Sequence, residues 1–204
     1  MTREEERRAR AAEEPIVGGI PEIPGIGAAM RLTPGLGTHL RALADEVLVH
    51  DFPGASLTRA EREVLATAVS ASNDCFFCMD SHAAHAAALL ELDSDDRLKP
   101  ALEAIKVGSV DGLNPKLQAL VHVARTVAAN ARRLTAEDVA AARAAGATDG
   151  DVQLAVVIAA AFSMYNRLVD GLRARTPGDV SAYRERAAEI AANGYSAASA
   201  LGRR

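Results

Sequence analysis

The chain has 204 residues, of which 49 % are hydrophobic and 25 % charged, an ordinary balance for one globular domain with a hydrophobic core. Its net charge of −4 is spread along the chain, which excludes a basic nucleic-acid-binding face and a polybasic membrane-binding segment. We find no run of about 18 apolar residues, so we expect no membrane-spanning helix. The first 14 residues are rich in Arg and Glu and lack an apolar signal core, so we expect a cytoplasmic protein.

Alanine supplies much of the apolar share, whereas tryptophan is absent and only 3 % of the residues are aromatic. Because alanine is the best helix former and a poor strand former, this composition favours helices. No window shows the sustained alternation of polar and apolar residues that half-buried strands require. We therefore predict an all-α protein, a single-domain helical bundle of about seven to nine helices.

The N-terminal residues 1–37 are predicted to form a charged stretch followed by an arm rich in proline and glycine. The charged part is residues 1–14, and the helix breakers are concentrated in residues 16–37. Such a density of breakers forbids a long helix and indicates an extended segment, ordered only where it lies on something else. The helical domain is expected over residues 38–194, with residues 195–204 as a short C-terminal tail.

Several helix boundaries can be located within the domain. A capping box from Thr58 to Glu61 begins a helix that the polar residues 72–74 interrupt. The next helix is expected from about Cys75 to Leu92, with Asp74 as its N-cap. Later helix starts are expected at Asn114-Pro115, Thr135, Thr148 and Thr176-Pro177, and the end of the last helix at Gly194.

The only cysteines of the chain, Cys75 and Cys78, are separated by two residues. In a cytosolic protein such a CxxC pair is more often redox-active or metal-binding than a structural disulfide. The loop that this disulfide would close is very short, so the bond would stabilise the fold little. We therefore interpret the pair as redox-active.

A histidine lies on the same predicted helix face as the two cysteines. Positions 75, 78 and 82 follow the i, i+3, i+7 spacing, so both sulfurs and the His82 imidazole should lie together. The amides and positive dipole end of the helix N-terminus favour a thiolate, which is the form that attacks a peroxide or a disulfide. His82 is placed to exchange a proton with Cys78, directly or through one water.

Glu63 becomes a candidate through its distance from the helix break at Asp74. Glu63 lies roughly 16 Å before the break and His82 roughly 12 Å after it, at about 1.5 Å per residue. Antiparallel packing of the two helices would set these side chains at similar heights. Because a carboxylate beside an imidazole orients it and raises its basicity, we predict a proton relay of Glu63, His82 and Cys78.

A zinc site and a pair of inert buried thiols are the alternatives for this segment. The zinc ligands would be Cys75, Cys78, His82 and His85. Ten residues of continuous helix span about 15 Å, whereas zinc ligands lie about 2.0–2.3 Å from the ion. Only two or three of these side chains could reach one ion, so we predict no metal site. A functional role for His85 stays open.

The segment from Glu63 to His82 resembles the signature of the AhpD-like family: Glu, eleven residues, Cys-x-x-Cys, three residues, His. That superfamily includes carboxymuconolactone decarboxylase, and the chain is most similar to its peroxidase-related branch. The likeness extends to Leu57-Thr58-x-x-Glu61 and to Phe162-x-x-Tyr165-Asn166-Arg167. It covers about residues 24–173.

This resemblance implies a thiol-dependent alkylhydroperoxidase that reduces small organic hydroperoxides. Cys78 would be the peroxidatic cysteine and Cys75 the more exposed, resolving one, while Glu63 and His82 would deprotonate Cys78 through water. An external dithiol, lipoyl-type in the best-known members, would reduce the disulfide, with no tightly bound cofactor. The protein would be a homo-oligomer. Phe77 stands where those members carry a second histidine, which removes one proton-transfer group.

Two further functions remain open. A lyase like carboxymuconolactone decarboxylase would not depend on a cysteine pair, and a non-catalytic redox sensor would use the same disulfide as a switch. Replacement of Cys78 would abolish peroxide turnover but leave decarboxylation intact. A sensor would show stoichiometric oxidation and a change of oligomeric state without turnover.

Overall fold

The computed structural model describes residues 2–93 and 98–201. Over these residues the chain has ten α-helices, two short 3₁₀ helices and no strand, which confirms the predicted all-α class. The elements are α1 (Arg3–Ala11), α2 (Ile26–Met30), α3 (Pro34–Leu48), α4 (Arg59–Ser72), α5 (Phe76–Leu92), α6 (Lys99–Lys106), α7 (Pro115–Asn130), η1 (Ala131–Arg133), α8 (Ala136–Ala144), α9 (Asp149–Gly171), η2 (Val180–Tyr183) and α10 (Arg184–Leu201). The prediction contained neither α2 nor α6, because no side-chain cap marks their starts.

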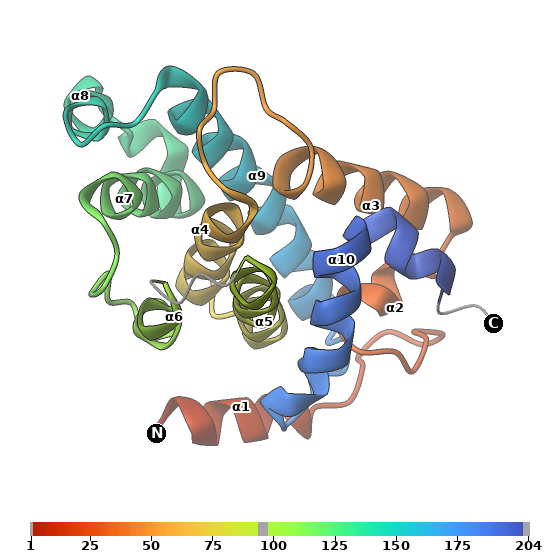
Figure 1. Ribbon diagram of the computed structural model, residues 1–204. Helices are drawn as coiled ribbons and strands as arrows, with labels where there is room; N and C mark the ends of the chain where they lie inside the picture. Colours follow the sequence, from red (N-terminus) through yellow and green to blue (C-terminus); the bar gives the residue numbers. More distant parts are fainter. Residues whose placement is uncertain (1, 94–97, 202–204) are drawn as a thin grey trace.

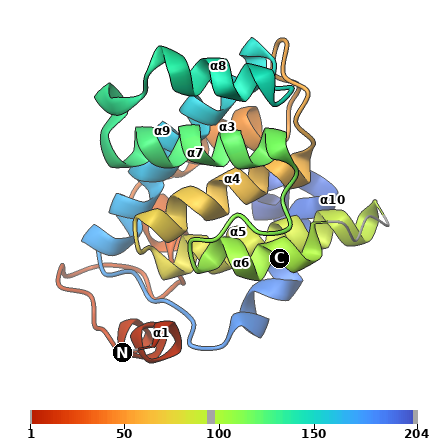
Figure 2. The same ribbon diagram turned by 90° about the vertical axis from the view of Figure 1, so that its left-hand side faces the viewer.

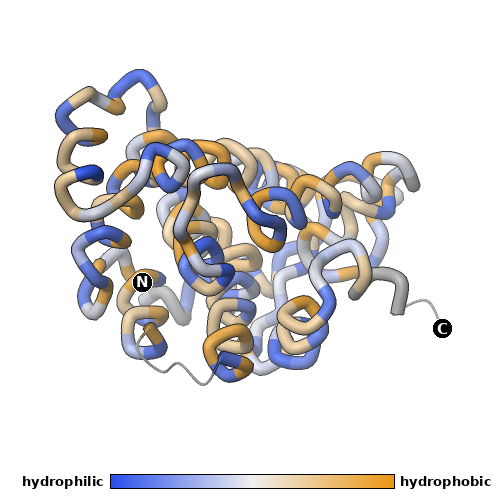
Figure 3. The backbone as a smooth tube through the Cα atoms, turned by 45° about the horizontal axis from the view of Figure 1, so that its top comes forward, coloured by the Kyte–Doolittle hydropathy of each residue, from blue (hydrophilic) through white to orange (hydrophobic). Residues whose placement is uncertain are grey.

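The antiparallel hairpin of α4 and α5 forms the centre of the fold. Helices α6 and α7 lie on one side of it, α3 and α10 lie on the other, and α9 crosses behind (Figures 1 and 2). Helix α4 is buried almost throughout, from residue 60 to residue 71. Apolar and polar residues alternate along the outer helices in Figure 3, as expected of helices that bury one face. The central hairpin is therefore held from several sides.

Helix α9 is long and apolar enough to cross a membrane by length and composition alone. The buried core helix of a globular protein can meet the same criterion. More than half of the apolar window is buried within the protein, and the helix packs against α4 and α7. These contacts are those of a central core helix.

Most of the predicted helix starts are present in the structure. Side-chain caps begin four helices as expected, at Thr58, Asn114, Thr135 and Thr148. Thr176-Pro177, in contrast, begins no helix, and the Asp179 side chain caps the short η2 instead. Helix α10 does not end at Gly194 but continues beyond a non-helical break at that residue. Residues 202–204 of the predicted tail lie outside the described part of the chain.

The N-terminal residues, the charged stretch together with the proline- and glycine-rich arm, are ordered because they lie on the helical domain. Arg7 of α1 forms a buried ion pair with Asp80 of α5, at 2.7 Å between Nε and Oδ2, and Lys106 Nζ lies 3.3 Å from Oδ1 of the same carboxylate. Further along, the amide of Gly25 donates to the carbonyl of Arg175 at 2.8 Å. The arm is thus fixed at both of its ends, and it passes below α10 toward α2 in Figure 1.

Candidate active site

The turn between α4 and α5 determines where the cysteine pair lies. Asp74 adopts a left-handed conformation, with φ 55°. The amide of Cys75 donates to Ser70 O at 3.0 Å and the amide of Asp74 donates to Ala71 O at 3.3 Å, the two bonds of a Schellman motif. Asp74 therefore belongs to the turn that ends α4. The prediction that Asp74 is the N-cap of α5 is wrong. Cys75 takes the N-cap position, and Cys78 lies in the first turn of α5.

A buried asparagine on α9 fastens this turn. Asn166 Nδ2 donates to Ser70 Oγ at 3.1 Å, and Asn73 Nδ2 donates to Asn166 Oδ1 at 2.8 Å. The two bonds join the end of α4 to α9. They therefore also fix the position of the turn from which α5 starts.

The two thiols lie together in the reduced state. Both cysteines are free, and they belong to one small buried cluster. The interaction with the Cys78 side chain, together with burial and the negative charge of a Cys78 thiolate, raises the pKa of Cys75 well above its ordinary value. Asp170, at the end of α9, also interacts with Cys75, and burial raises the pKa of that carboxyl group. Asp170 is a neighbour of the pair that the sequence did not reveal.

Neither thiol is accessible, so the expectation that Cys75 is the more exposed one is wrong. Cys75 is 0 % exposed and Cys78 is 2 % exposed. Ile20 of the arm and Ile26 of α2 pack against the small cluster that contains both cysteines. The proline- and glycine-rich arm, which looked like a loose extension in the sequence, therefore closes over its own cysteine pair.

Glu63 and His82 form the contact that the predicted hairpin geometry implies. His82 Nδ1 lies 2.6 Å from Glu63 Oε2, and His85 Nδ1 lies 3.8 Å from the same oxygen. All three side chains are buried. Burial alone would raise the pKa of Glu63, but the charge and hydrogen bond of His82, with a smaller effect of His85, lower it to about 2. Burial lowers the pKa of His85.

Tyr195 of α10 completes this cluster and is the functional candidate that sequence reasoning missed. Its hydroxyl lies 2.7 Å from Glu63 Oε1, 3.0 Å from His85 Nδ1 and 3.3 Å from His82 Nδ1. Burial, followed by the charge of Glu63, raises the pKa of Tyr195 well above its ordinary value. The tyrosine is therefore neutral at physiological pH and can donate its proton to the carboxylate. The only sequence signal was an aromatic residue directly after the glycine expected to end the helix.

Glu63, His82 and His85 are also the residues that could ligate a metal ion. Their donor atoms lie within 4.8 Å of one another, and all three residues are buried. The Tyr195 hydroxyl, however, is within 3.3 Å of a donor atom of each of them. Because the carboxylate, both Nδ1 atoms and the hydroxyl can satisfy one another, the arrangement is complete as a hydrogen-bond network. The set of zinc ligands considered as an alternative from the sequence, two cysteines and two histidines, is not the set of residues in this cluster.

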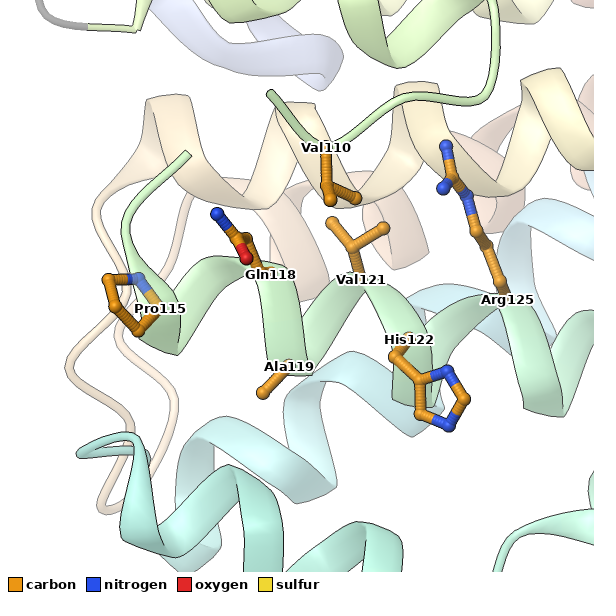
Figure 4. Close-up of a pocket in the computed structure, with 7 residues that line it drawn as sticks. All are labelled: Val110, Pro115, Gln118, Ala119, Val121, His122 and Arg125. Carbon is orange, nitrogen blue, oxygen red and sulfur yellow. The ribbon is translucent and has the colours of Figure 1, made fainter. Parts of the chain in front are cut away.

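A separate pocket lies on α7, away from the cysteine pair (Figure 4). Its lining residues are Val110, Pro115, Gln118, Ala119, Val121, His122 and Arg125. Its histidine, His122, is paired with Asp138 of α8 at 2.9 Å. The pocket therefore contains none of the predicted site residues and no redox-active group.

Comparison with known proteins agrees with the resemblance seen in the motif. Residues 34–95 match the model of the carboxymuconolactone decarboxylase family, a segment that contains Glu63, both cysteines and His82. No curated protein matches the sequence.

Two solved structures have the same fold. One is an alkylhydroperoxidase AhpD core, an uncharacterized peroxidase-related protein from Ralstonia eutropha JMP134, with 23 % identity, a TM-score of 0.66, and coverage of 81 % of this chain and 82 % of that one. The other is an uncharacterized peroxidase-related protein from Silicibacter sp. TM1040, with 18 % identity, a TM-score of 0.66, and coverage of 85 % and 93 %. Residues 34–95 are thus similar to the carboxymuconolactone decarboxylase family, and the chain shares the fold of the two peroxidase-related structures.

Proposed function

We propose that this protein is a thiol-dependent peroxidase that reduces small organic hydroperoxides. The observation that carries the proposal is that Cys75 and Cys78 lie together in one buried cluster near the N-terminus of α5, the helix that also carries His82. Two cysteines that lie together can form a disulfide with little movement of the backbone. His82 is in turn held by the Glu63 carboxylate at 2.6 Å, as the base of an activated nucleophile must be.

The oxidation step uses Cys78 and His82. His82 takes the proton of Cys78 through a water molecule, since no hydrogen bond joins the two side chains within the described part of the chain. The thiolate attacks the terminal peroxide oxygen, an S–O bond forms and the O–O bond breaks. The alcohol product leaves with the proton that His82 returns, and Cys78 remains as a sulfenic acid.

The resolving step uses Cys75 and Asp170. The sulfur of Cys75 attacks the sulfur of oxidised Cys78, so that the S–S bond forms, the S–O bond breaks and water leaves. Asp170, which interacts with Cys75, accepts the thiol proton and passes it to the hydroxyl group that leaves Cys78, so that this group departs as water. Burial raises the pKa of the Asp170 carboxyl group toward the range of a useful base. An external dithiol, of the lipoyl type or another, then reduces the disulfide by exchange. No tightly bound cofactor is needed, and we place the protein in the cytoplasm as a homo-oligomer.

The chemical steps are tested by trapping the intermediate. One equivalent of cumene hydroperoxide is added to the reduced protein in the presence of dimedone, which captures sulfenic acids, and the products are identified by mass spectrometry. We expect a Cys75–Cys78 disulfide in the wild type, a dimedone adduct on Cys78 in Cys75→Ser, and no adduct in Cys78→Ser. An adduct on Cys75 in Cys78→Ser, with none on Cys78 in the other variant, would reverse the two roles.

The burial of both thiols favours a redox sensor as the second candidate function. A pair that is 0 % and 2 % exposed can be oxidised by a small peroxide yet remain closed to a bulky reductant. A sensor would form the disulfide once and turn over no further peroxide in the presence of a dithiol. Sizing of the oxidised and reduced forms would then show a change of oligomeric state.

A further inference from the structure

The starting point is a break in α10 directly before Tyr195. Gly194 has φ 78° and ψ 178°, outside the helical region and in the left-handed half of conformational space that glycine tolerates. The chain on either side of it is helical. The break therefore begins a second helical segment at Tyr195, with a new set of unpaired amides.

Asp45 of α3 satisfies these amides. Its Oδ1 accepts from the Tyr195 amide at 2.7 Å, and its Oδ2 accepts from the Ser196 amide at 3.0 Å. Asp45 is itself 7 % exposed, and a Cβ atom on Gly194 would lie 3.0 Å from its Oδ1. A buried carboxylate of α3, far away in the sequence, thus fixes the backbone of Tyr195.

The result is that the Tyr195 hydroxyl reaches the Glu63–His82 pair. The side chain is 8 % exposed, and its hydroxyl is 2.7 Å from Glu63 Oε1, while Glu63 Oε2 is 2.6 Å from His82 Nδ1. Each carboxylate oxygen therefore has its own donor. The other charged groups near this network are Asp45, Arg59 and Arg186.

Counting protons assigns the tautomer of His82. Glu63 is ionised, with a pKa of about 2, so both of its oxygens only accept. Nδ1 of His82 must then carry the proton of the 2.6 Å bond. Tyr195 uses its single proton toward Oε1, and its oxygen accepts from Nδ1 of His85 at 3.0 Å. Every group in the network has a partner in this arrangement, and Nε2 is then the unprotonated nitrogen of the neutral His82 ring.

We propose that Tyr195 is a positioning residue of the relay: it holds Glu63 against His82, so that Nε2 of His82 remains the atom that accepts the proton of Cys78. Among the described residues, the Tyr195 hydroxyl is the hydrogen-bond partner of Oε1. Without it, the carboxylate can turn toward His85, whose Nδ1 is 3.8 Å from Oε2. His82 would then populate the other tautomer, which cannot take the thiol proton through Nε2. This inference rests on the proposed function, since the relay matters only if Cys78 gives up a proton.

The test compares Tyr195→Phe with Tyr165→Phe, both in a Cys75→Ser background so that alkylation reports Cys78 alone. Tyr165 is the control for a buried tyrosine hydroxyl near Cys78: its charge would interact with that of Cys78, but its hydrogen bond goes to Leu40 O at 2.7 Å and not to Glu63. The rate of iodoacetamide alkylation, which follows the thiolate fraction, is measured from pH 5 to 10. We expect Tyr195→Phe to move the midpoint to higher pH by about one unit, which lowers the rate at pH 7 roughly tenfold. Tyr165→Phe should keep the profile of the background protein.

Superimposable profiles for Tyr195→Phe and the background protein would overturn the proposal. ¹⁵N NMR of the histidine rings gives a test that needs no variant, since wild-type His82 should be protonated on Nδ1. A wild-type His82 protonated on Nε2 would also overturn it. Both readouts are independent of peroxide turnover. If peroxidase activity is absent but alkylation shows the expected shift, the proposed function fails and the role of Tyr195 stands.

Discussion

At the scale of single residues, the charge of Glu63 has a consequence for stability. Its pKa in the folded protein is about 2, against an ordinary value of 4.5. A carboxylate with a lowered pKa stabilises the fold above the unfolded pKa, and this contribution is lost as the pH falls through the folded one. We expect the wild-type free energy of unfolding to decrease steeply between about pH 4.5 and 2, and the decrease to be smaller in Glu63→Gln. Urea unfolding at a series of pH values measures both slopes.

The matched control for this prediction is Glu91→Gln, on an exposed position of α5. It removes the same kind of charge without disturbing a buried pair, so its pH dependence should follow that of the wild type. Parallel curves for the wild type and Glu63→Gln would show that Glu63 is not ionised against His82 in the folded state.

A contact between two side chains could be predicted from the sequence where both residues belong to one helical hairpin. Glu63 and His82 lie on consecutive antiparallel helices, so counting residues from the break was enough to predict their contact. Tyr195 could not be found this way, because the position of α10 depends on Asp45, which is 150 residues away from it in the chain. The predicted exposure of Cys75 was wrong for a similar reason, since the exposure depends on the path of an arm without regular structure.

At the scale of elements, the arm controls access to the cysteine pair. Gly25 has a φ of +55°, and a Cβ atom there would overlap the ring of Phe77, which lies between the two cysteines in the chain. We expect Gly25→Ala to loosen the arm and to accelerate iodoacetamide modification of the native thiols. An arm destabilised by about 1.4 kcal/mol is open about tenfold more often, so the modification rate should rise by about that factor.

Gly18→Ala is the control for this substitution. Gly18 belongs to the same arm, but a Cβ atom there meets nothing within 4 Å and its φ is not positive. Its thiols should react at the wild-type rate. If Gly25→Ala also reacts at that rate, the arm does not limit access to the cysteines.

Helix boundaries could be predicted where local interactions define them, and not where contacts between residues distant in the sequence do. Capping boxes such as those at Thr58, Thr135 and Thr148 need only residues within one turn, and all three begin helices as predicted. The end of α10 was misplaced because Gly194 is typical of a helix end, while a carboxylate from α3 restarts the helix after it. The Schellman turn at Asp74 was also missed, because an aspartate holds the left-handed position that glycine usually takes.

At the scale of the whole molecule, we expect association into a homo-oligomer. Val157 and Met164 are exposed at 36 % and 38 % on one face of α9, a helix that is otherwise mostly buried. Light scattering should give a mass that is a multiple of 21.3 kDa, and Met164→Lys should lower it. Ala192→Lys, at an exposed position of α10, adds the same charge elsewhere and should leave the mass unchanged. A 21.3 kDa wild-type protein would contradict this expectation.

The most direct test of the central claim is steady-state consumption of cumene hydroperoxide by the purified protein with dihydrolipoamide or dithiothreitol as reductant. We predict repeated turnover by the wild type, no turnover by Cys78→Ser, and a rate lowered by about 10²-fold in Glu63→Gln, the low end of the contribution of a general base. Consumption of a single equivalent by the wild type, followed by a stable disulfide, would contradict the peroxidase and leave a redox sensor. Equal turnover by the wild type and Cys78→Ser would contradict the role of the cysteine pair altogether.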